Sequence, residues 1–94
     1  MRKIFRSARF TRAYKKFVRS YPFLKTKIDL TLKEMEKNVF SHHLETHKLS
    51  GVLYGLLACS CGYDCRIVFS IEKEEENNKE IIVLVDIGTH DEVY

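Results

Sequence analysis

The first half of the chain has the hydrophobic spacing of helices. From Phe10 to Tyr21 the apolar residues recur at intervals of three and four, opposite a row of Lys and Arg, and Ser7 is a suitable N-cap. Beyond Pro22 a second stripe with the same spacing extends as far as Met35. The predicted elements of this half are a strand over 2–6 and helices over about 8–21 and 22–38.

The second half alternates apolar and polar residues, as strands do. In the segment YDCRIVFSI the side chains of Cys65, Ile67 and Phe69 fall on one face, and those of Asp64 and Arg66 on the other. The later run EIIVLVD is apolar and β-branched, which is typical of a buried strand. The charged stretch EKEEENNK between these runs predicts a solvated hairpin tip, away from any functional groove. The strands of this half are predicted over about 52–60, 63–71 and 80–87.

The predicted order of elements is β-α-α-β-β-β, in a single domain over 1–94. Two amphipathic helices joined at a proline indicate an αα-hairpin, and the strands that follow indicate a meander. This order predicts an α+β fold in which a twisted antiparallel sheet carries both helices on one face. The opposite face of the sheet is then available for a functional site.

Charge is distributed unevenly along the chain, although the net charge is only +3. Residues 1–28 contain ten Lys or Arg and no acid, whereas residues 29–94 contain six bases and all thirteen acids. A basic block of this kind is typical of proteins that bind a polyanion or an acidic partner, and a solvated helix face gives the same pattern.

The absence of long apolar runs and the spacing of the cysteines argue against a membrane protein, a secreted protein and a zinc protein. No apolar run approaches the roughly 18 residues of a membrane-spanning helix, and the N-terminal MRKIFRSARF lacks the apolar core of a secretory signal. The three cysteines are odd in number and crowded into CSCGYDC, so they do not indicate a secreted disulfide framework, and a cytoplasmic location is favoured. Their spacing fits no common zinc site, and we expect them to pack in strands as small apolar groups.

Five polar residues of the second half suggest a chemistry. They are His47, Asp64, Arg66, His90 and Tyr94. RNA carries its own nucleophile in the 2′-hydroxyl, and its cleavage needs a base, an acid and a cation on the phosphate. Histidine suits the first two roles and arginine the third, while tyrosine stacks on a base or donates a proton, so that no metal ion is required. Taken singly, an Asp–Arg pair or a histidine is more often an ordinary surface feature, and the interest of these residues lies in the group.

Basic side chains elsewhere are candidates for RNA binding. They are Arg9, Arg12, Lys15 and Lys16 in the first helix, and Lys48 in the connection after the second. Contacts between such side chains and phosphates make binding strongly salt-dependent. The same helix face is also suited to an acidic segment of a protein partner.

Four segments of the second half form a recognisable set: HKLSG (47–51), Gly55, GYDCRIVF (62–69) and LVDIGTHDEVY (84–94). They resemble the RelE/ParE superfamily of bacterial toxins from type II toxin–antitoxin systems, and the loop and terminus resemble its YafQ-type branch. The order β-α-α-β-β-β is also that of this RelE-like microbial RNase fold. The resemblance implies a metal-independent, cofactor-free mRNA endoribonuclease, an mRNA interferase, that acts in the A site of the translating 70S ribosome. It also implies a cognate antitoxin protein as partner.

The resemblance assigns a role to each of the five polar residues. His47 matches the loop histidine of the YafQ-like pattern, and Asp64 matches its strand aspartate. His90 matches the near-terminal histidine, a general acid or base, and Tyr94 the terminal aromatic that takes part in catalysis. Arg66 matches the phosphate-binding arginine of RelE-like members.

The chain departs from the YafQ-like pattern at the end of the second strand. Ala58 and Ser60 stand where that pattern has an acid and a histidine, so we expect His90 and Arg66 to contribute more of the catalysis. Two alternatives stay open: a ParE-like toxin, which shares the fold but inhibits DNA gyrase by binding, and a catalytically inactive relative that binds RNA or protein. The two histidines and the tyrosine favour the nuclease, because a binding inhibitor needs no acid–base groups.

Overall fold

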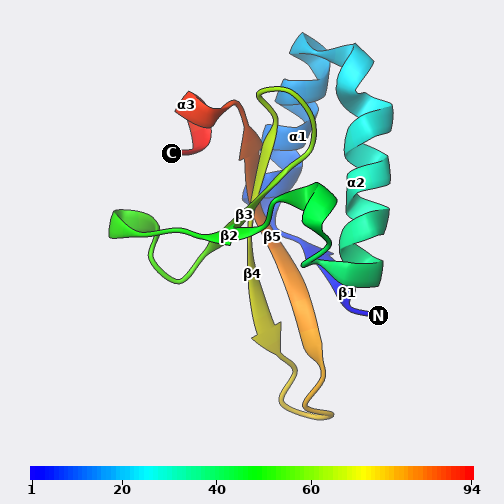
Figure 1. The fold of residues 1–94 in the computed structure, drawn as a ribbon, viewed down its shortest axis with the longest axis vertical. Coiled ribbons are helices and arrows are strands. Elements are labelled where there is room, and N and C mark those ends of the chain that lie inside the picture. Colours follow the sequence, from blue (N-terminus) through cyan, green and yellow to red (C-terminus); the bar gives the residue numbers. More distant parts are fainter.

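Helices cover one face of a five-stranded sheet in the computed structural model, which describes residues 1–94 (Figure 1). The elements are β1 (Lys3–Arg6), α1 (Ala8–Ser20), η1 (Pro22–Leu24), α2 (Lys25–Asn38), η2 (His42–Leu44), β2 (His47–Lys48), η3 (Gly51–Leu53), β3 (Leu57–Ser60), β4 (Arg66–Lys73), β5 (Glu80–Gly88) and α3 (His90–Val93), with η marking short 3-10 turns. The α+β class and the predicted order of the main elements are confirmed. Two short elements, β2 and α3, are additional to the prediction.

The two N-terminal helices form where the hydrophobic stripes predict them. Ser7 caps α1, because its Oγ accepts a hydrogen bond from the Phe10 amide at 3.0 Å. Pro22 begins η1 and separates α1 from α2. Phe10 and Phe17 from α1 are buried together with Met35 from α2 in the core against the sheet. None of the helices is both long and apolar enough to cross a membrane.

The sheet is mixed rather than wholly antiparallel. Its strand order is β1-β5-β4-β3-β2, in which the neighbours from β5 to β2 are antiparallel. The first strand, β1, pairs in parallel with the last strand, β5. No hairpin turn fixes the direction of β1, since its partner lies at the other end of the sequence. Instead, β1 leads directly into α1, whose N-cap is Ser7. The Ser7 amide still belongs to the pairing with β5, because it donates to the Leu84 carbonyl at 3.1 Å.

The two faces of the sheet have different surroundings. Cys59 and Phe69 face the helices and belong to the hydrophobic core. The register pairs His47 with Ala58, and Ala58 with Val68, across β2, β3 and β4. Because paired residues share a face and successive residues alternate, this row lies on the face opposite the helices. We call this face the site face. The sequence predicts that neither α1 nor α2 covers it.

The second predicted strand is shorter than expected and begins only at Leu57. The residues before it form a loop, which is closed by a hydrogen bond from the Leu49 amide to the Leu56 carbonyl at 3.0 Å. Within it Gly51 and Gly55 have φ of +67° and +96°, a backbone conformation that interrupts a strand and favours glycine. The charged turn between the last two strands forms as predicted, and Figure 1 shows its tip at the opposite end of the strands from α3.

The cysteines differ from the prediction in one respect. All three are fully buried, but Cys61 and Cys65 form a disulfide bond across the turn between β3 and β4, while Cys59 is free. Their spacing alone did not reveal the bond, because only the turn brings the two Cα atoms to 5.0 Å. Burial raises the pKa of the Cys59 thiol to about 12, so this cysteine stays protonated and unreactive at neutral pH.

A polar contact joins the two helices at their surface. The Tyr14 hydroxyl donates a hydrogen bond to Asp29 Oδ1 at 3.0 Å, and Lys25 Nζ lies 2.9 Å from Asp29 Oδ2. The hydrogen bond from Lys25 lowers the pKa of Asp29 below its ordinary value of 3.8, burial opposes this shift, and the bond from Tyr14 adds to it. Burial and the bond to Asp29 raise the pKa of Tyr14, which therefore remains a donor at neutral pH.

We expect Tyr14→Phe to lower the free energy of unfolding at neutral pH by at most about 1 kcal/mol, because it removes one half-buried hydrogen bond. The folded-state pKa of Asp29 lies below its unfolded value, so the contribution of this carboxylate is present above about pH 4 and is lost as the pH falls through the folded-state pKa. Urea unfolding of both proteins at neutral and acidic pH measures the effect. A difference that does not shrink at acidic pH would contradict the role of Asp29.

Reduction of the bond between Cys61 and Cys65 should lower the free energy of unfolding by about 2 kcal/mol, the value expected for so short a loop. Urea unfolding with and without a reductant measures this change. Alkylation of denatured, unreduced protein should modify Cys59 alone, and alkylation after reduction should modify all three cysteines. Modification of all three before reduction would show that the bond is absent.

Candidate active site

A single helical turn after β5 presents two of the predicted site residues. Thr89 and Glu92 form a capping box, in which Thr89 Oγ1 accepts from the Glu92 amide at 3.3 Å and Glu92 Oε1 accepts from the Thr89 amide at 2.8 Å. The Tyr94 amide donates to the His90 carbonyl at 3.1 Å and completes the turn. Because His90 and Tyr94 are four residues apart, their side chains lie on the same side of α3.

The signal for α3 is present in the sequence, although the prediction did not include this helix. It is the capping-box spacing of Thr89 and Glu92, directly after an apolar strand. The absence of a side chain at Gly88 leaves room for α3. A Cβ at Gly88 would lie 3.0 Å from Glu92 Oε1 and 3.2 Å from a methyl group of Val93, so α3 packs directly on the backbone of β5.

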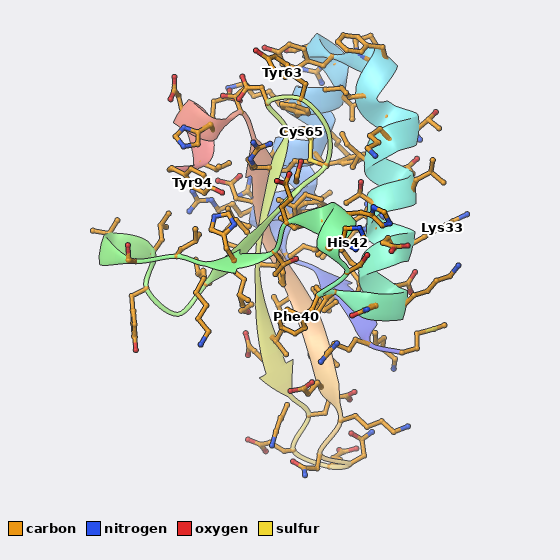
Figure 2. The ribbon with its side chains drawn as sticks, viewed as in Figure 1. Lys33, Phe40, His42, Tyr63, Cys65 and Tyr94 are labelled. Carbon is orange, nitrogen blue, oxygen red and sulfur yellow. A yellow bond between two sulfur atoms is a disulfide. The ribbon has the colours of Figure 1, made fainter.

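The Tyr94 ring lies next to the rings of both predicted histidines. Its centroid is 4.6 Å from that of His90 at an interplanar angle of 89°, and 6.5 Å from that of His47 at 72°. Figure 2 shows Tyr94 between α3 and β2, the elements from which these two histidines come. The fold therefore brings together side chains that are more than forty residues apart in the sequence, as the prediction required.

Each histidine uses its Nδ1 atom within the protein and leaves Nε2 without a protein partner. His47 Nδ1 lies 3.0 Å from the Glu45 carbonyl oxygen, which only accepts hydrogen bonds, so Nδ1 carries the proton and donates. His90 Nδ1 lies 3.4 Å from Asp91 Oδ1. Both Nε2 atoms are free to exchange a proton with a substrate.

The turn between β3 and β4 holds Asp64 against α3. Asp64 Oδ1 accepts a hydrogen bond from the His90 amide at 3.0 Å. The prediction that Asp64 lies on a strand beside Arg66 is wrong: Asp64 has a φ of +50°, and β4 begins at Arg66. The reason is that the chain is still in the turn, which is closed by a hydrogen bond from the Cys61 amide to the Cys65 carbonyl at 2.9 Å. Asp64 therefore positions His90 and does not pair with Arg66.

Arg66 lies at the start of β4, is half-buried and belongs to no salt bridge. Its Nη1 donates to the carbonyls of Cys65 at 2.9 Å and Gly62 at 3.3 Å. These bonds fix one side of the guanidinium and leave Nε and Nη2 available for a phosphate. Burial raises the pKa of Tyr94 above its ordinary value of 10.0, and the charge of Arg66 opposes this shift. The phenol is therefore protonated at neutral pH and is a proton donor.

Two positions on the site face carry no titratable group. The register places Ala58 beside His47 and Ser60 beside Arg66. Ala58 is fully buried, and the Ser60 hydroxyl lies 3.4 Å from the Gly62 carbonyl. The acid–base groups therefore come from β2 and α3 and not from β3. No group of three or more His, Cys, Asp or Glu side chains is placed to hold a metal ion.

The basic residues predicted to bind RNA lie in two places. Arg9, Arg12, Lys15 and Lys16 belong to α1, and Lys48 follows His47 in β2. Arg9 is engaged with Asp86 at 3.2 Å, whereas the other four have no acidic partner. Lys16 lines a cleft together with Glu92, where α1 approaches α3. Lys48 pairs with Leu57, so its side chain leaves β2 on the face opposite to that of His47, and the cations of α1 reach α3 only through Lys16.

Comparison with solved structures relates the fold to bacterial toxins. YafQ from E. coli strain BL21(DE3) has a TM-score of 0.79 at 14% identity, over 100% of this chain and 99% of that chain. A chain of the E. coli DinJ–YafQ toxin–antitoxin complex has a TM-score of 0.76 at 15% identity, over 99% and 97% of the two chains. The YoeB dimer from Staphylococcus aureus has a TM-score of 0.70 at 21% identity, over 95% and 97%.

The sequence itself matches none of the protein-family models and none of the curated proteins with which it was compared. At the identities found among solved structures, the likeness establishes the fold. This is the RelE-like toxin fold of YafQ and YoeB, which the sequence resemblance implied.

We expect Thr89→Ala to weaken α3 by about 1 kcal/mol, because it removes the N-cap of an exposed helix, with little effect on global unfolding. NMR measures the consequence, since the aromatic ring of Tyr94 shifts the imidazole resonances of His90 only while α3 is ordered. Thr89→Ser keeps the capping oxygen and should preserve the wild-type resonances. Wild-type resonances in Thr89→Ala would show that the capping box does not position His90.

Proposed function

We propose that this chain is the toxin of a type II toxin–antitoxin system and acts as a ribosome-dependent, metal-independent endoribonuclease that cleaves mRNA and so inhibits translation. One observation carries the proposal: the protonated Tyr94 phenol lies between two imidazoles, each with a free Nε2. The half-free guanidinium of Arg66 adds a phosphate ligand near the phenol. The fold shared with YafQ and YoeB supports the same function.

The proposed reaction uses the 2′-hydroxyl of the RNA as nucleophile. This oxygen attacks the adjacent phosphorus, which forms a cyclic phosphate and releases the 5′-oxygen of the next nucleotide. The Nε2 atom of one histidine, His47 or His90, takes the proton of the 2′-hydroxyl, and the other histidine or Tyr94 donates a proton to the leaving oxygen. Arg66 Nε and Nη2 bind the phosphate oxygens, on which negative charge increases in the transition state. Asp64 fixes the backbone of His90.

The proposed partners are the ones that this function requires. The DinJ–YafQ complex supports a cognate antitoxin as protein partner, and mRNA in the A site of the 70S ribosome is the proposed substrate complex. This substrate places the protein in the cytoplasm, where Cys61 and Cys65 are expected to be reduced. The turn that holds Asp64 would still be closed by hydrogen bonds from the Cys61 amide to the Cys65 carbonyl and from the Cys65 amide to the Gly62 carbonyl.

The arrangement of the site favours the nuclease over the two alternatives. A ParE-like inhibitor that binds DNA gyrase has no need of two imidazoles and a phenol with free polar atoms on one surface. An inactive relative is supported by Ala58 and Ser60, since neither supplies a proton-transfer group at its position on the site face. Against this, His47, His90 and Tyr94 still supply both an acid and a base.

His90→Ala should reduce the rate of mRNA cleavage by roughly 100-fold or more, because it removes one of the two positioned imidazoles. Primer extension on a defined mRNA in a purified translation system, with and without ribosomes, measures the cuts. His42→Ala is a matched control, since His42 is also exposed but lies beside α2, away from Tyr94 (Figure 2).

Cuts that require ribosomes, vanish in His90→Ala and persist in His42→Ala would support both the activity and the role of His90. Cleavage by His90→Ala at the wild-type rate would show that the assignment is wrong. If folded wild-type protein blocks translation and leaves the mRNA intact, the inactive relative is favoured. Inhibition of gyrase supercoiling without any RNA cleavage would favour the ParE-like alternative.

A further inference from the structure

An exposed aromatic surface borders the candidate active site and has no role in the proposed proton transfers. It consists of Tyr21, Phe23 and Tyr63, which are 38%, 77% and 96% exposed, and we call it the aromatic end. Figure 2 shows Tyr63 at the end of the molecule where the chain passes from α1 to α2. Phe23 lies in η1 between these helices, and its ring is 6.3 Å from that of Tyr21 at an interplanar angle of 85°.

The turn that carries Tyr63 is packed against the helices. A Cβ at Gly62 would lie 3.5 Å from side-chain atoms of both Leu24 and Lys27, so the turn contacts η1 and the start of α2. Gly62 and Asp64, on either side of Tyr63, have φ of +130° and +50°. The backbone of this turn is therefore supported by the helices, while the Tyr63 ring is exposed to solvent.

The aromatic end is continuous with the site through Asp64. This residue directly follows Tyr63, and its carboxylate holds the His90 amide at 3.0 Å. Tyr63 and Asp64 are consecutive residues, which lie about 3.8 Å apart at their Cα atoms. The backbone of Tyr63 is therefore next to the residue that holds the His90 amide. An RNA strand that was bound at His90 and Arg66 and left the site on this side would pass close to Tyr63.

Two unpaired cations lie at the aromatic end, and Asp64 is the acid that follows Tyr63 in the chain. Arg19, in the last turn of α1, and Lys27, beside the Tyr63 turn, are exposed and have no acidic partner. Lys25, in contrast, is engaged with Asp29 at 2.9 Å. Exposed ring faces among unpaired cations are the combination that binds single-stranded RNA, because bases stack on the rings and phosphates contact the cations. An apolar protein surface would leave both cations without a partner.

We propose that the aromatic end is a base-binding site for single-stranded RNA, in which Tyr63 stacks on a nucleotide that flanks the bond to be cut. The inference rests on the proposed function, since it extends the same RNA path beyond His90. Tyr63 is a substrate-binding residue in this scheme. Arg19 and Lys27 supply phosphate contacts.

The direct test is the affinity for a short single-stranded RNA whose 2′-hydroxyls are methylated, so that it cannot be cut. Fluorescence anisotropy at low salt should show that Tyr63→Ala weakens binding roughly 5- to 100-fold, the range for loss of one stacked base. Tyr63→Phe keeps the ring and should retain wild-type affinity. Tyr54→Ala removes a tyrosine that is 86% exposed in the loop before β3, and should change nothing. Thermal unfolding should be unaltered in all three, because both tyrosines are exposed.

Primer extension on ribosome-bound mRNA separates this inference from the proposed function. If wild type cleaves the mRNA and only Tyr63→Ala, among the three variants, binds RNA more weakly, both the nuclease and the base-binding site are supported. If Tyr63→Ala binds and cuts RNA like wild type, the base-binding site is overturned and the nuclease stands. If wild type binds RNA through Tyr63 but cuts nothing, the base-binding site stands and the nuclease is overturned. Absence of RNA binding by wild type, or a Tyr63→Ala variant that loses affinity only for the antitoxin, also overturns the base-binding site.

Discussion

Burial of one sheet face beneath two helices is the constraint on which the rest of the structure depends. Phe10, Met35 and Phe69 are fully buried between the helices and the sheet, and loss of a side chain of this size from a core costs about 2–5 kcal/mol. Because this layer supplies most of the core, the opposite face buries only a few apolar residues, such as Ala58 and Val68. The polar residues His47 and Arg66 can therefore occupy the site face. The candidate site uses a surface that packing left free and not a cavity.

The site is assembled by local interactions that are independent of the core. The Thr89–Glu92 capping box forms α3, the absence of a side chain at Gly88 lets it approach β5, and Asp64 holds its first residue. Each is a contact between short, largely exposed segments, and such segments open at lower free energy than core strands. Binding of a large substrate complex across α3 and the Asp64 turn would stabilise the arrangement, since it would favour the closed form of both.

Local patterns predicted most of the fold, and the errors lie where the structure depends on distant partners or on turns. The stripes of α1 and α2 and the alternation of β4 are properties of neighbouring residues, and they were confirmed. The direction of β1 depends on β5, at the other end of the sequence. The predicted strand included Asp64, which lies in the turn, because alternation of apolar and polar residues does not show where a turn ends. The prediction also lacked α3, although the capping-box spacing of Thr89 and Glu92 is present in the sequence. His47, His90 and Tyr94 converge as predicted, because the register and α3 carry them to one face.

The parallel pairing of β1 with β5 has a consequence for the order of events during biosynthesis. β1 finds its partner only when residues 80–88 have emerged from the ribosome, and α3 follows them. Contacts between opposite ends of a chain close late and slow folding. If the chain has the function proposed above, its site can form only after residues 80–94 have been made, because α3 carries His90 and follows β5.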